Sequence, residues 1–303
     1  MTTMPRRNTP RLCFIGFGEA GQAMAAGLRA EGIAQIAAWD ILFPAAEGER
    51  LRQAGAQIGV RLAASAADAV QDSDIIIFAV TAASSLAAAQ SVAAHLDGHP
   101  FYLDVNSVSP GRKQATAKLL GERARYIDVA ILSPIHPARH QSPMLLAGPH
   151  GEAALPILQA LGMKTTLTGP ETGAAAAIKM VRSVMIKGIE ALTLECFVAA
   201  ERAGVVEQVA DSLRNNYPTL DWSKVIEYNI ERMASHGERR AAEMEEVADT
   251  LRELGVDPHM VAATVTRQRE MGAIGKEPAV RDTLKAGRNA MLNAISAAVK
   301  DEL

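Results

Sequence analysis

Apolar and polar positions alternate in blocks over the first half of the chain. Short apolar runs separated by alanine-rich amphipathic stretches extend from Arg11 to about Thr168. Such runs are typical of buried parallel strands, and the stretches between them of helices that cover both faces of the sheet. The predicted strands are Leu12–Ile15, Gln35–Trp39, Ile75–Val80, Phe101–Asn106, Tyr126–Ile131, Met144–Ala147 and Lys164–Leu167. The predicted helices begin near Glu19, Ala45, Ser65, Ser84, Ser109 and Gly151. The pattern predicts a doubly wound sheet.

The pattern changes after Gly169 and Pro170. Thr172 to Ala203 contains no proline, is rich in Ala, Met, Leu and Lys, and predicts one helix of about 45 Å at ~1.5 Å per residue. The remainder predicts further helices, with breaks at Tyr217-Pro218, Gly255–Pro258 and Gly275–Pro278. The expected fold is α/β: an N-terminal Rossmann doubly wound sheet, residues 1–168, joined through a long interdomain helix to an all-α C-terminal domain, residues 169–303.

Composition and charge narrow the class of protein. The chain is 49% hydrophobic and 21% charged, which is typical of a globular protein. Its formal net charge of −3 gives no positive excess for binding nucleic acid or an anionic membrane. No apolar run approaches the ~18 residues of a membrane span, and the N-terminal MTTMPRRNTPR lacks the apolar region of a signal peptide. We therefore expect a cytoplasmic protein that acts on a small-molecule substrate, with no nucleic-acid or membrane partner.

The two cysteines, Cys13 and Cys196, lie far apart in sequence, each within an apolar stretch. This placement predicts buried thiols in a reducing compartment rather than a disulfide.

A glycine-rich turn, GFGEAGQAMAAGL, connects the first predicted strand to the first predicted helix. Gly16, Gly18 and Gly21 have the G-x-G-x-x-G spacing of dinucleotide-binding turns. In such turns the first glycine permits the tight turn, the second lets backbone approach a pyrophosphate, and the third allows close packing of helix and strand. The residues between these glycines, which are also candidates for cofactor binding, are Phe17, Glu19 and Ala20.

Asp40 follows the second predicted strand, at about the 20-residue separation at which a carboxylate binds the adenosine ribose hydroxyls. The same carboxylate repels a 2′-phosphate, and no arginine follows it, so NAD is the expected cofactor and NADP the less favoured one. A solvated acid at a strand end is the alternative interpretation. Val80, Thr81 and Asn106 complete the predicted cofactor site at the carboxyl edge of the sheet, although Thr81 equally suits a helix N-cap.

These residues resemble the β-hydroxyacid dehydrogenase family, which includes 3-hydroxyisobutyrate and 6-phosphogluconate dehydrogenases. The resemblance covers nearly the whole chain. The segment DVNSVSP, Asp104 to Pro110, is similar to the family's substrate-binding segment, with Asn106 and Ser107 at its polar positions. The segment DVAILSP is similar to a second family strand end, where Ser133 is retained and Pro134 and Ile135 replace two glycines.

The segment GPETGAAAAIKMVRS resembles the entry of the family's interdomain helix and places Lys179 at the catalytic lysine. Ser183 stands where the family has an asparagine, and Arg182 where 6-phosphogluconate dehydrogenases have a histidine. Independently of the family, alcohol oxidation by hydride transfer requires a group that accepts the hydroxyl proton. A partly desolvated lysine suits that role, because burial lowers its pKa. A lysine that snorkels from an interdomain helix is the alternative.

Other polar residues are candidates for binding the substrate. Ser107 and Ser133 follow two predicted strands and suit contacts with a substrate carboxylate, although either also suits a cap or strand end. The loop SPIHPARHQSP contains two histidines but no carboxylate at ligand spacing, so we expect no metal site there. Arg139 in this loop is a candidate anion contact. By helical spacing, Lys179 shares one stripe with Ser183, Ile186 and Glu190.

The segment HGERRAAEMEEVADTLRELGVDPHM predicts a helix with an apolar stripe of Met244, Val247, Leu251 and Leu254. It resembles the C-terminal domain of phosphogluconate-dehydrogenase-like proteins, most of them without an assigned substrate. By that resemblance a Lys-Asp pair of 3-hydroxyisobutyrate dehydrogenases is replaced here by Ala242 and Glu243. The charge of the missing lysine would then come from Arg239 or Arg240, unless these two lie on the surface.

The expected function is NAD-dependent oxidation of a 3-hydroxy carboxylic acid, with Lys179 as general acid and base. An imine reductase-like enzyme and a noncatalytic NAD-binding sensor are the alternatives. Because the helix predicted over Thr172 to Ala203 is apolar on several faces, we also expect a homodimer formed through the C-terminal helices.

Overall fold

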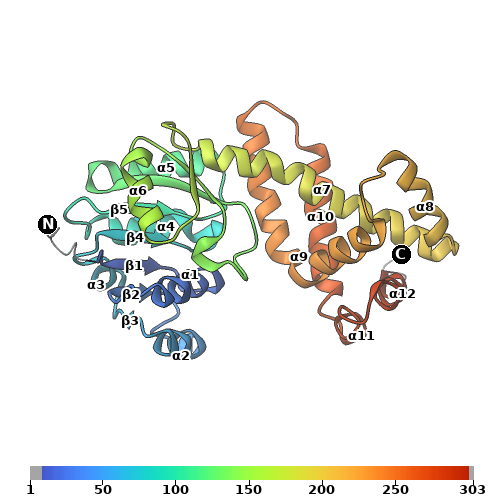
Figure 1. Ribbon diagram of the computed structural model, residues 1–303, viewed down its shortest axis with the longest axis horizontal. Coiled ribbons are helices and arrows are strands. Elements are labelled where there is room, and N and C mark those ends of the chain that lie inside the picture. Colours follow the sequence, from blue (N-terminus) through green and yellow to red (C-terminus); the bar gives the residue numbers. More distant parts are fainter. Residues whose placement is uncertain (1–8, 300–303) are drawn as a thin grey trace, which may run out of the picture. The chain divides into compact units, whose positions relative to one another are not determined.

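The computed structural model describes residues 9–299 and divides the chain into two compact units, the first ending at Lys179 and the second starting at Met180. The first unit is built on one eight-stranded sheet with the order β3-β2-β1-β4-β5-β6-β7-β8 (Figure 1). The strands are β1 Leu12–Ile15, β2 Ile36–Trp39, β3 Arg61–Leu62, β4 Ile75–Phe78, β5 Phe101–Asp104, β6 Arg125–Ile131, β7 Met144–Ala147 and β8 Thr165–Gly169. Among the pairings of these described strands, only that of β6 with β7 is antiparallel. The order of the first six strands is that of a Rossmann fold, which confirms the predicted fold class.

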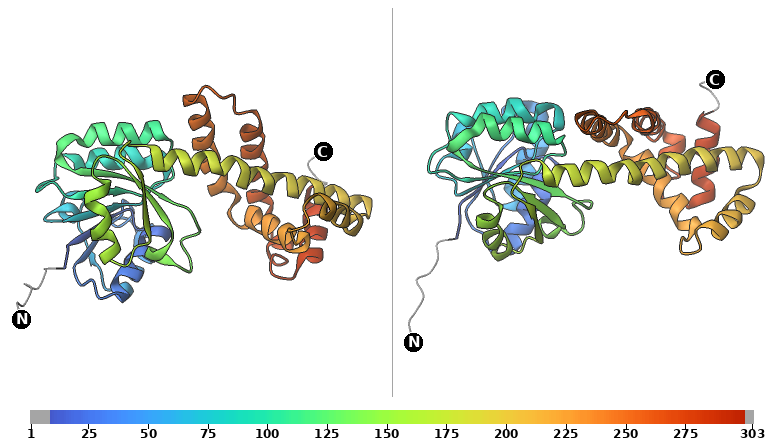
Figure 2. Two further views of the ribbon diagram at one scale, coloured as in Figure 1. Left: turned by 45° about the horizontal axis from the view of Figure 1, so that its top comes forward. Right: turned by 90° about the horizontal axis from the view of Figure 1, so that it is seen from above.

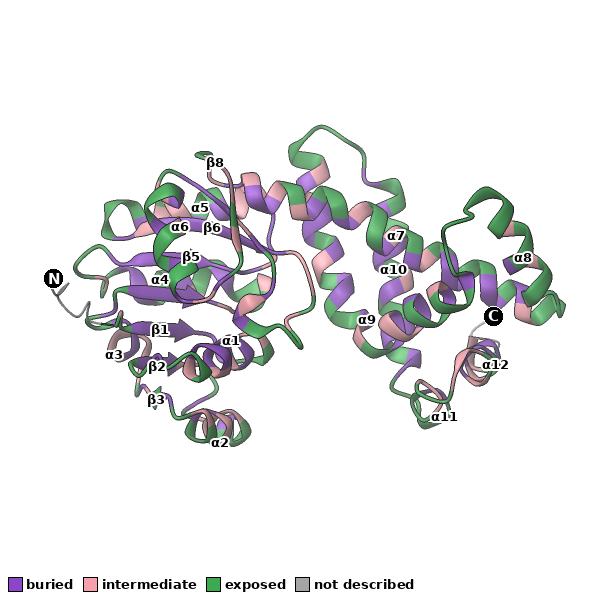
Figure 3. Ribbon diagram, in the orientation of Figure 1, coloured by how far each residue is buried: buried purple, intermediate pink, exposed green. Residues whose placement is uncertain are grey.

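Helices cover both faces of this sheet, as Figure 2 shows. The helices are α1 Glu19–Ala30, α2 Glu49–Ile58, α3 Ala66–Val70, α4 Ser85–Ala93, α5 Pro110–Leu120 and α6 Gly151–Ala160. On one face, α1 and α6 pack on a core that includes Phe14 and Leu146. On the other face, α3 and α4 pack on a core that includes Phe78 and Tyr102. Strands β1 and β5 are buried along their whole length, as their purple colour in Figure 3 shows. Because successive strand residues point to opposite faces, β1 and β4 are apolar throughout, whereas β5 ends at the buried Asp104.

The second unit is helical, as predicted. Helix α7, Ala174–Ala203, begins in the first unit and is 30 residues long. It is followed by α8 Val206–Asn216, α9 Trp222–Glu253, α10 His259–Ile274, α11 Pro278–Arg281 and α12 Arg288–Ala298. The core of this unit includes Phe197, Ile226, Met233 and Leu292. The first two predicted breaks fall between helices, and the third spans the loop from the end of α10 to Pro278, the first residue of α11. Within residues 9–299, no helix is long and apolar enough to cross a membrane.

Several details differ from the sequence prediction. Strand β3 was not predicted, because two residues leave no periodic pattern. Strands β4 and β5 end before Val80 and Asn106, which lie in the loops beyond them. The prediction of a buried thiol is confirmed for Cys13 and wrong for Cys196, which is exposed on α7. Leu254, predicted to belong to the apolar stripe of α9, is 59% exposed because the helix ends at the preceding residue.

Candidate functional site

The glycine-rich turn between β1 and α1 is packed tightly at two of its three glycines. Gly16 has a φ of +89°, and a Cβ built there would lie 2.2 Å from the carbonyl oxygen of Ala79. A Cβ on Gly21 would lie 2.5 Å from the carbonyl oxygen of Gly16. Gly18, the N-cap of α1, differs, since a Cβ there would meet nothing within 4 Å. The space in front of the first turn of α1 is therefore open, and the backbone N–H groups of that turn face it.

Asp40 lies beside this turn, at the end of β2. Its Oδ2 accepts a hydrogen bond from the backbone N–H of Phe17 at 2.7 Å, and its Oδ1 accepts one from Leu42 at 3.0 Å. Each carboxylate oxygen can accept a second hydrogen bond. Phe17 is completely buried, so this predicted cofactor residue contributes its backbone to the turn and its ring to the core. Glu19 is exposed in the first turn of α1 and Ala20 is half-buried.

Three predicted cofactor residues lie together beyond β4 and β5. The side-chain Oδ1 of Asn106 accepts a hydrogen bond from the backbone N–H of Val80 at 2.7 Å. Asn106 is buried, and its Nδ2 is a buried donor with no acceptor in the described protein. Thr81 is at the N-cap position of a short turn but makes no side-chain capping bond; its hydroxyl bonds to that of Ser84 at 3.0 Å. An unsatisfied buried amide is costly, so Asn106 fits a site in which a ligand supplies the acceptor.

Lys179 and Ser107 meet at the same edge of the sheet. The Lys179 Nζ donates to the Ser107 Oγ at 2.6 Å, and both side chains are half-buried. Ser107 directly follows Asn106, while Lys179 comes from the second turn of α7. Ser133, which follows β6, is also half-buried, and its hydroxyl makes a long 3.3 Å contact with the carbonyl of Pro134. An ammonium, a hydroxyl and an orphaned amide donor thus gather along one edge.

Arg139 packs near α1 in the first unit, and the α7 residues beyond Lys179 belong to the second unit. Arg139 is exposed with a φ of +56°, and its Cβ lies against Gly27 of α1. The adjacent His140 is buried there, and burial lowers the pKa of its imidazole. Arg182 is exposed and Ser183 is buried, both in the second unit. Among residues 9–299, no group of three or more His, Cys, Asp or Glu side chains is arranged to hold a metal ion.

In the second unit, the polar face of α7 packs against α9. Lys187 and Glu190 of α7 are buried, whereas Ile186, predicted to share this stripe, is 42% exposed. Lys187 Nζ pairs with Glu243 at 2.9 Å, and Arg240 pairs with Glu190. Of the two arginines predicted to replace the charge of the missing lysine, Arg240 is paired with Glu190 of α7, whereas Arg239 is exposed and pairs with Glu243.

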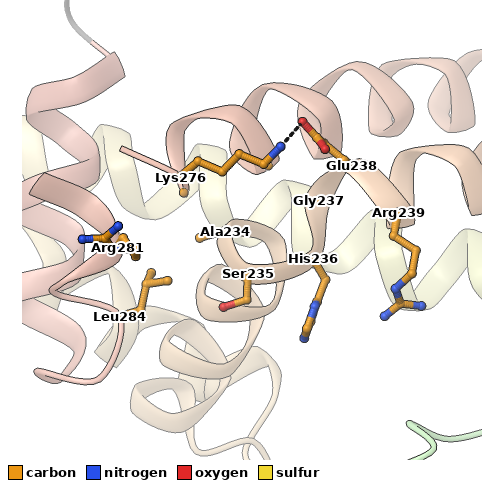
Figure 4. Close-up of a pocket in the computed structure, with 11 residues that line it drawn as sticks. Ala234, Ser235, His236, Gly237, Glu238, Arg239, Lys276, Arg281 and Leu284 are labelled. Atoms are coloured by element: carbon orange, nitrogen blue, oxygen red, sulfur yellow. Dashed lines mark hydrogen bonds and ion pairs between the residues drawn. The ribbon is translucent and has the colours of Figure 1, made fainter. Parts of the chain in front are cut away.

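A hollow of about 580 Å³ lies over α9, the end of α10 and α11, also in the second unit (Figure 4). Three cationic side chains line it, each with an acidic partner. Lys276 pairs with Glu238 at 2.6 Å, Arg239 with Glu243 at 2.7 Å, and Arg281 with Asp282 at 2.9 Å. Because these charges are balanced and exposed, the hollow presents little net attraction for an anion.

Sequence reasoning missed one buried ionic group in the first unit. Lys113 of α5 is 0% exposed and lies within 3.1 Å of Asp104 and 3.5 Å of Asp128. The sequence indicated part of this group, because Asp104 ends one apolar strand and Asp128 interrupts another, and an unpaired carboxylate buried there would be costly. The lysine gave no signal, because an isolated lysine on a helix is normally exposed.

Family models match two parts of the chain. Residues 11–107 match a family described as NADP oxidoreductase, coenzyme F420-dependent. Residues 200–271 match a domain of unknown function. A curated protein of Methanothermus fervidus, described as an uncharacterized 28.5 kDa protein, is 28% identical over 84% of this chain and 96% of its own length.

Solved structures match the whole fold. A conserved hypothetical protein from Sinorhizobium meliloti is 33% identical, with a TM-score of 0.76 over 96% of this chain and 97% of its own. A conserved protein called MTH1747, described as structurally similar to 3-hydroxyacid dehydrogenases, is 29% identical, with a TM-score of 0.69 over 87% of this chain and 97% of its own. A 3-hydroxyisobutyrate dehydrogenase of Mycobacterium tuberculosis (18% identity, TM-score 0.70, covering 88% and 94%) shares the fold. So does an imine reductase of Myxococcus stipitatus in complex with NAD+ (21% identity, TM-score 0.56, covering 94% and 98%).

Proposed function

The chain belongs to the β-hydroxyacid dehydrogenase family of NAD(P)-dependent oxidoreductases, and from this we propose that it oxidises a 3-hydroxy carboxylic acid with Lys179 as general acid and base. The observation that supports the proposal most is the 2.6 Å hydrogen bond between Lys179 Nζ and Ser107 Oγ. It puts a proton carrier and a hydroxyl side by side where open α/β sheets bind ligands. We assign residues 1–168 to cofactor binding and residues 169–303 to substrate binding and dimerisation.

The residues of the glycine-rich turn fit a dinucleotide. The open space at Gly18 suits a pyrophosphate placed against the N-terminus of α1, whose partial positive charge favours an anion. Asp40 keeps accepting capacity for the ribose hydroxyls and opposes a 2′-phosphate, which favours NAD over NADP. The orphaned Nδ2 of Asn106 suits the carbonyl of a nicotinamide carboxamide. When bound, the oxidised nicotinamide provides the hydride acceptor.

Lys179 performs the proton transfer in this proposal. Its neutral amine accepts the proton of the substrate hydroxyl as the carbon–hydrogen bond is broken and the carbonyl forms, and its ammonium returns the proton in the reverse direction. Ser107 Oγ accepts a hydrogen bond from Lys179, so its own O–H is free in direction to donate to a substrate oxygen. In this proposal Ser133 donates to the substrate carboxylate in exchange for its long contact with the carbonyl oxygen of Pro134. Ser183, Arg182 and Arg139 stay predicted substrate contacts on the sequence argument alone.

We further propose a homodimer formed through α7. Four of its large apolar side chains follow a 4-4-3 spacing and are strongly exposed: Val181 by 45%, Met185 by 63%, Ile189 by 43% and Leu192 by 58%. Such a stripe on one helix suits coverage by a second copy. We expect an interface of about 2,000 Å² or more, as in obligate dimers.

A panel of 3-hydroxy acids, assayed for NADH and NADPH formation by absorbance, tests the proposed function. The expected result is turnover of at least one acid with NAD preferred. The same panel includes cyclic imines with NADH and NADPH, because the chain shares the fold of an imine reductase. Reduction of an imine without oxidation of any hydroxy acid would refute the proposal in favour of the imine reductase alternative. Cofactor binding with no turnover of either class would favour the sensor.

A further inference from the structure

Lys113 is a completely buried cation that the proposed reaction does not use. Its Nζ donates to the carbonyl oxygen of Asp104 at 2.5 Å and pairs with the carboxylates of Asp104 at 3.1 Å and Asp128 at 3.5 Å. Side-chain exposure is 1% for the lysine and 0% for both aspartates. One helix residue thus joins the end of β5 to the middle of β6.

The two carboxylates outnumber the one ammonium, and dipoles balance the remaining charge. Asp104 accepts hydrogen bonds from the Tyr126 hydroxyl at 2.8 Å and from the backbone N–H of Asn106 at 3.0 Å. Asp128 Oδ2 accepts from the backbone N–H groups of Gly173 at 3.1 Å and Ala176 at 3.0 Å. These two N–H groups belong to the start of α7, where the helix dipole stabilises a negative charge.

Each aspartate accepts a hydrogen bond from the backbone close to one member of the Lys179–Ser107 pair. Asn106, held by Asp104, directly precedes Ser107, and Ala176, held by Asp128, lies less than one turn before Lys179. The distance between Nζ and Oγ therefore depends on how Asp104 and Asp128 are spaced. Lys113 is the side chain that pairs with both.

We propose that Lys113 is a positioning residue that sets the geometry of Lys179 against Ser107. The expected loss of kcat rests on the proposed function, whereas the expected change in the position of Lys179 relative to Ser107 does not. Without the ammonium, no side chain bridges Asp104 to position 128, and the loop that bears Ser107 is no longer held at a fixed spacing from the first turns of α7. A displacement near 1 Å at a reacting group is sufficient for a loss of about 10²-fold in kcat.

The experiment separates positioning from folding by keeping the cluster's charge. Lys113→Met combined with Asp128→Asn keeps the net charge of the cluster at −1, as in the wild type, and the amide oxygen introduced at position 128 retains an acceptor for α7. Asp128→Asn alone is the background against which the loss of the lysine is measured, and the wild type is the reference of equal net charge. Lys118→Met, an exposed lysine on the same helix, is the matched control. The readouts are the thermal midpoint, kcat, cofactor Kd, and competitive acetylation of Lys179 with acetic anhydride as a function of pH.

Positioning predicts that the double variant melts close to its background and binds cofactor with the same Kd, yet has a kcat about 10²-fold lower and a Lys179 acetylation profile displaced along the pH axis. Acetylation needs no turnover, so it tests the positioning even if no hydroxy acid is oxidised. A double variant with the kcat and acetylation profile of its background would overturn the proposal. Failure of the double variant to fold would also overturn it, because Lys113 would then serve the fold alone.

Discussion

Removing the proton carrier is the most direct test of the proposed chemistry. Lys179→Met keeps a similar side-chain volume and helix propensity but deletes the ammonium that contacts Ser107 at 2.6 Å. General acid–base catalysis contributes about 10² to 10⁴ in rate, which corresponds to about 2.7 to 5.4 kcal/mol of activation free energy. We expect kcat to fall within that range while the Kd for cofactor, measured by fluorescence titration, changes less than about twofold.

Ser107→Ala extends this test into a double-mutant cycle. Loss of a hydrogen bond to a charged group costs about 1.5 to 3 kcal/mol, so the single variant should lose about 10-fold to 150-fold in kcat/KM. In the Lys179→Met background the same serine has no ammonium to hold, and its removal should cost far less. Steady-state kinetics of the four proteins give the coupling energy. Full turnover by Lys179→Met, or strictly additive losses, would refute the assigned roles.

The other predictions concern the cofactor turn, the loop on α1 and the dimer. Asp40→Ser should narrow the preference for NAD over NADP by about 1 to 3 kcal/mol, measured as the ratio of kcat/KM values; a wild type that prefers NADP would contradict the assignment. Gly16→Ala should abolish dinucleotide binding in a titration, because its Cβ would lie 2.2 Å from the carbonyl oxygen of Ala79; unchanged affinity would show that the turn can open. Burial lowers the pKa of His140 below its ordinary 6.5, so the unfolded state binds more protons and His140 lowers stability as the pH falls below about 6.5. When the pH is lowered from 7.5 to 5.5, the thermal midpoint of the wild type should therefore fall more than that of His140→Phe. Equal falls in the two proteins would contradict this linkage. Wild-type protein should scatter light at about twice 32.1 kDa, and Met185→Glu at half of that; a monomeric wild type with full activity would remove the dimer from the proposal.

The central strands β1 and β4 were predictable because they are buried on both faces and are therefore apolar along their whole length. Strand β1 reads LCFI and β4 reads IIIF, with every residue buried. Strand ends were less predictable, since Val80 and Asn106 belong to loops in which the side chain of one satisfies the backbone of the other. A residue pattern along the chain contains no information on such a contact between neighbouring loops.

Charged residues were harder to place than apolar ones. Lys113 and Arg240 are both buried, and their partners lie on other elements of the fold. Lys113 pairs with Asp104 and Asp128, and Arg240 pairs with Glu190. A buried charge is stable only where its partner is brought by the fold, so its burial follows from tertiary structure and not from local periodicity. Lys179 was found through a resemblance to a family motif, and the contact with Ser107 became visible only in the folded chain.

The exposed position of Cys196 gives this chain a chemical reporter. Cys196 lies one turn beyond Leu192, on the same side of α7 as the exposed apolar stripe, whereas Cys13 is completely buried. A thiol reagent therefore meets one accessible cysteine, at the surface that a second copy would cover. Partial burial raises the pKa of the Cys196 thiol, so alkylation proceeds best at alkaline pH. The rate of Cys196 alkylation, measured as the protein is diluted, therefore reports association of two copies without any engineered label.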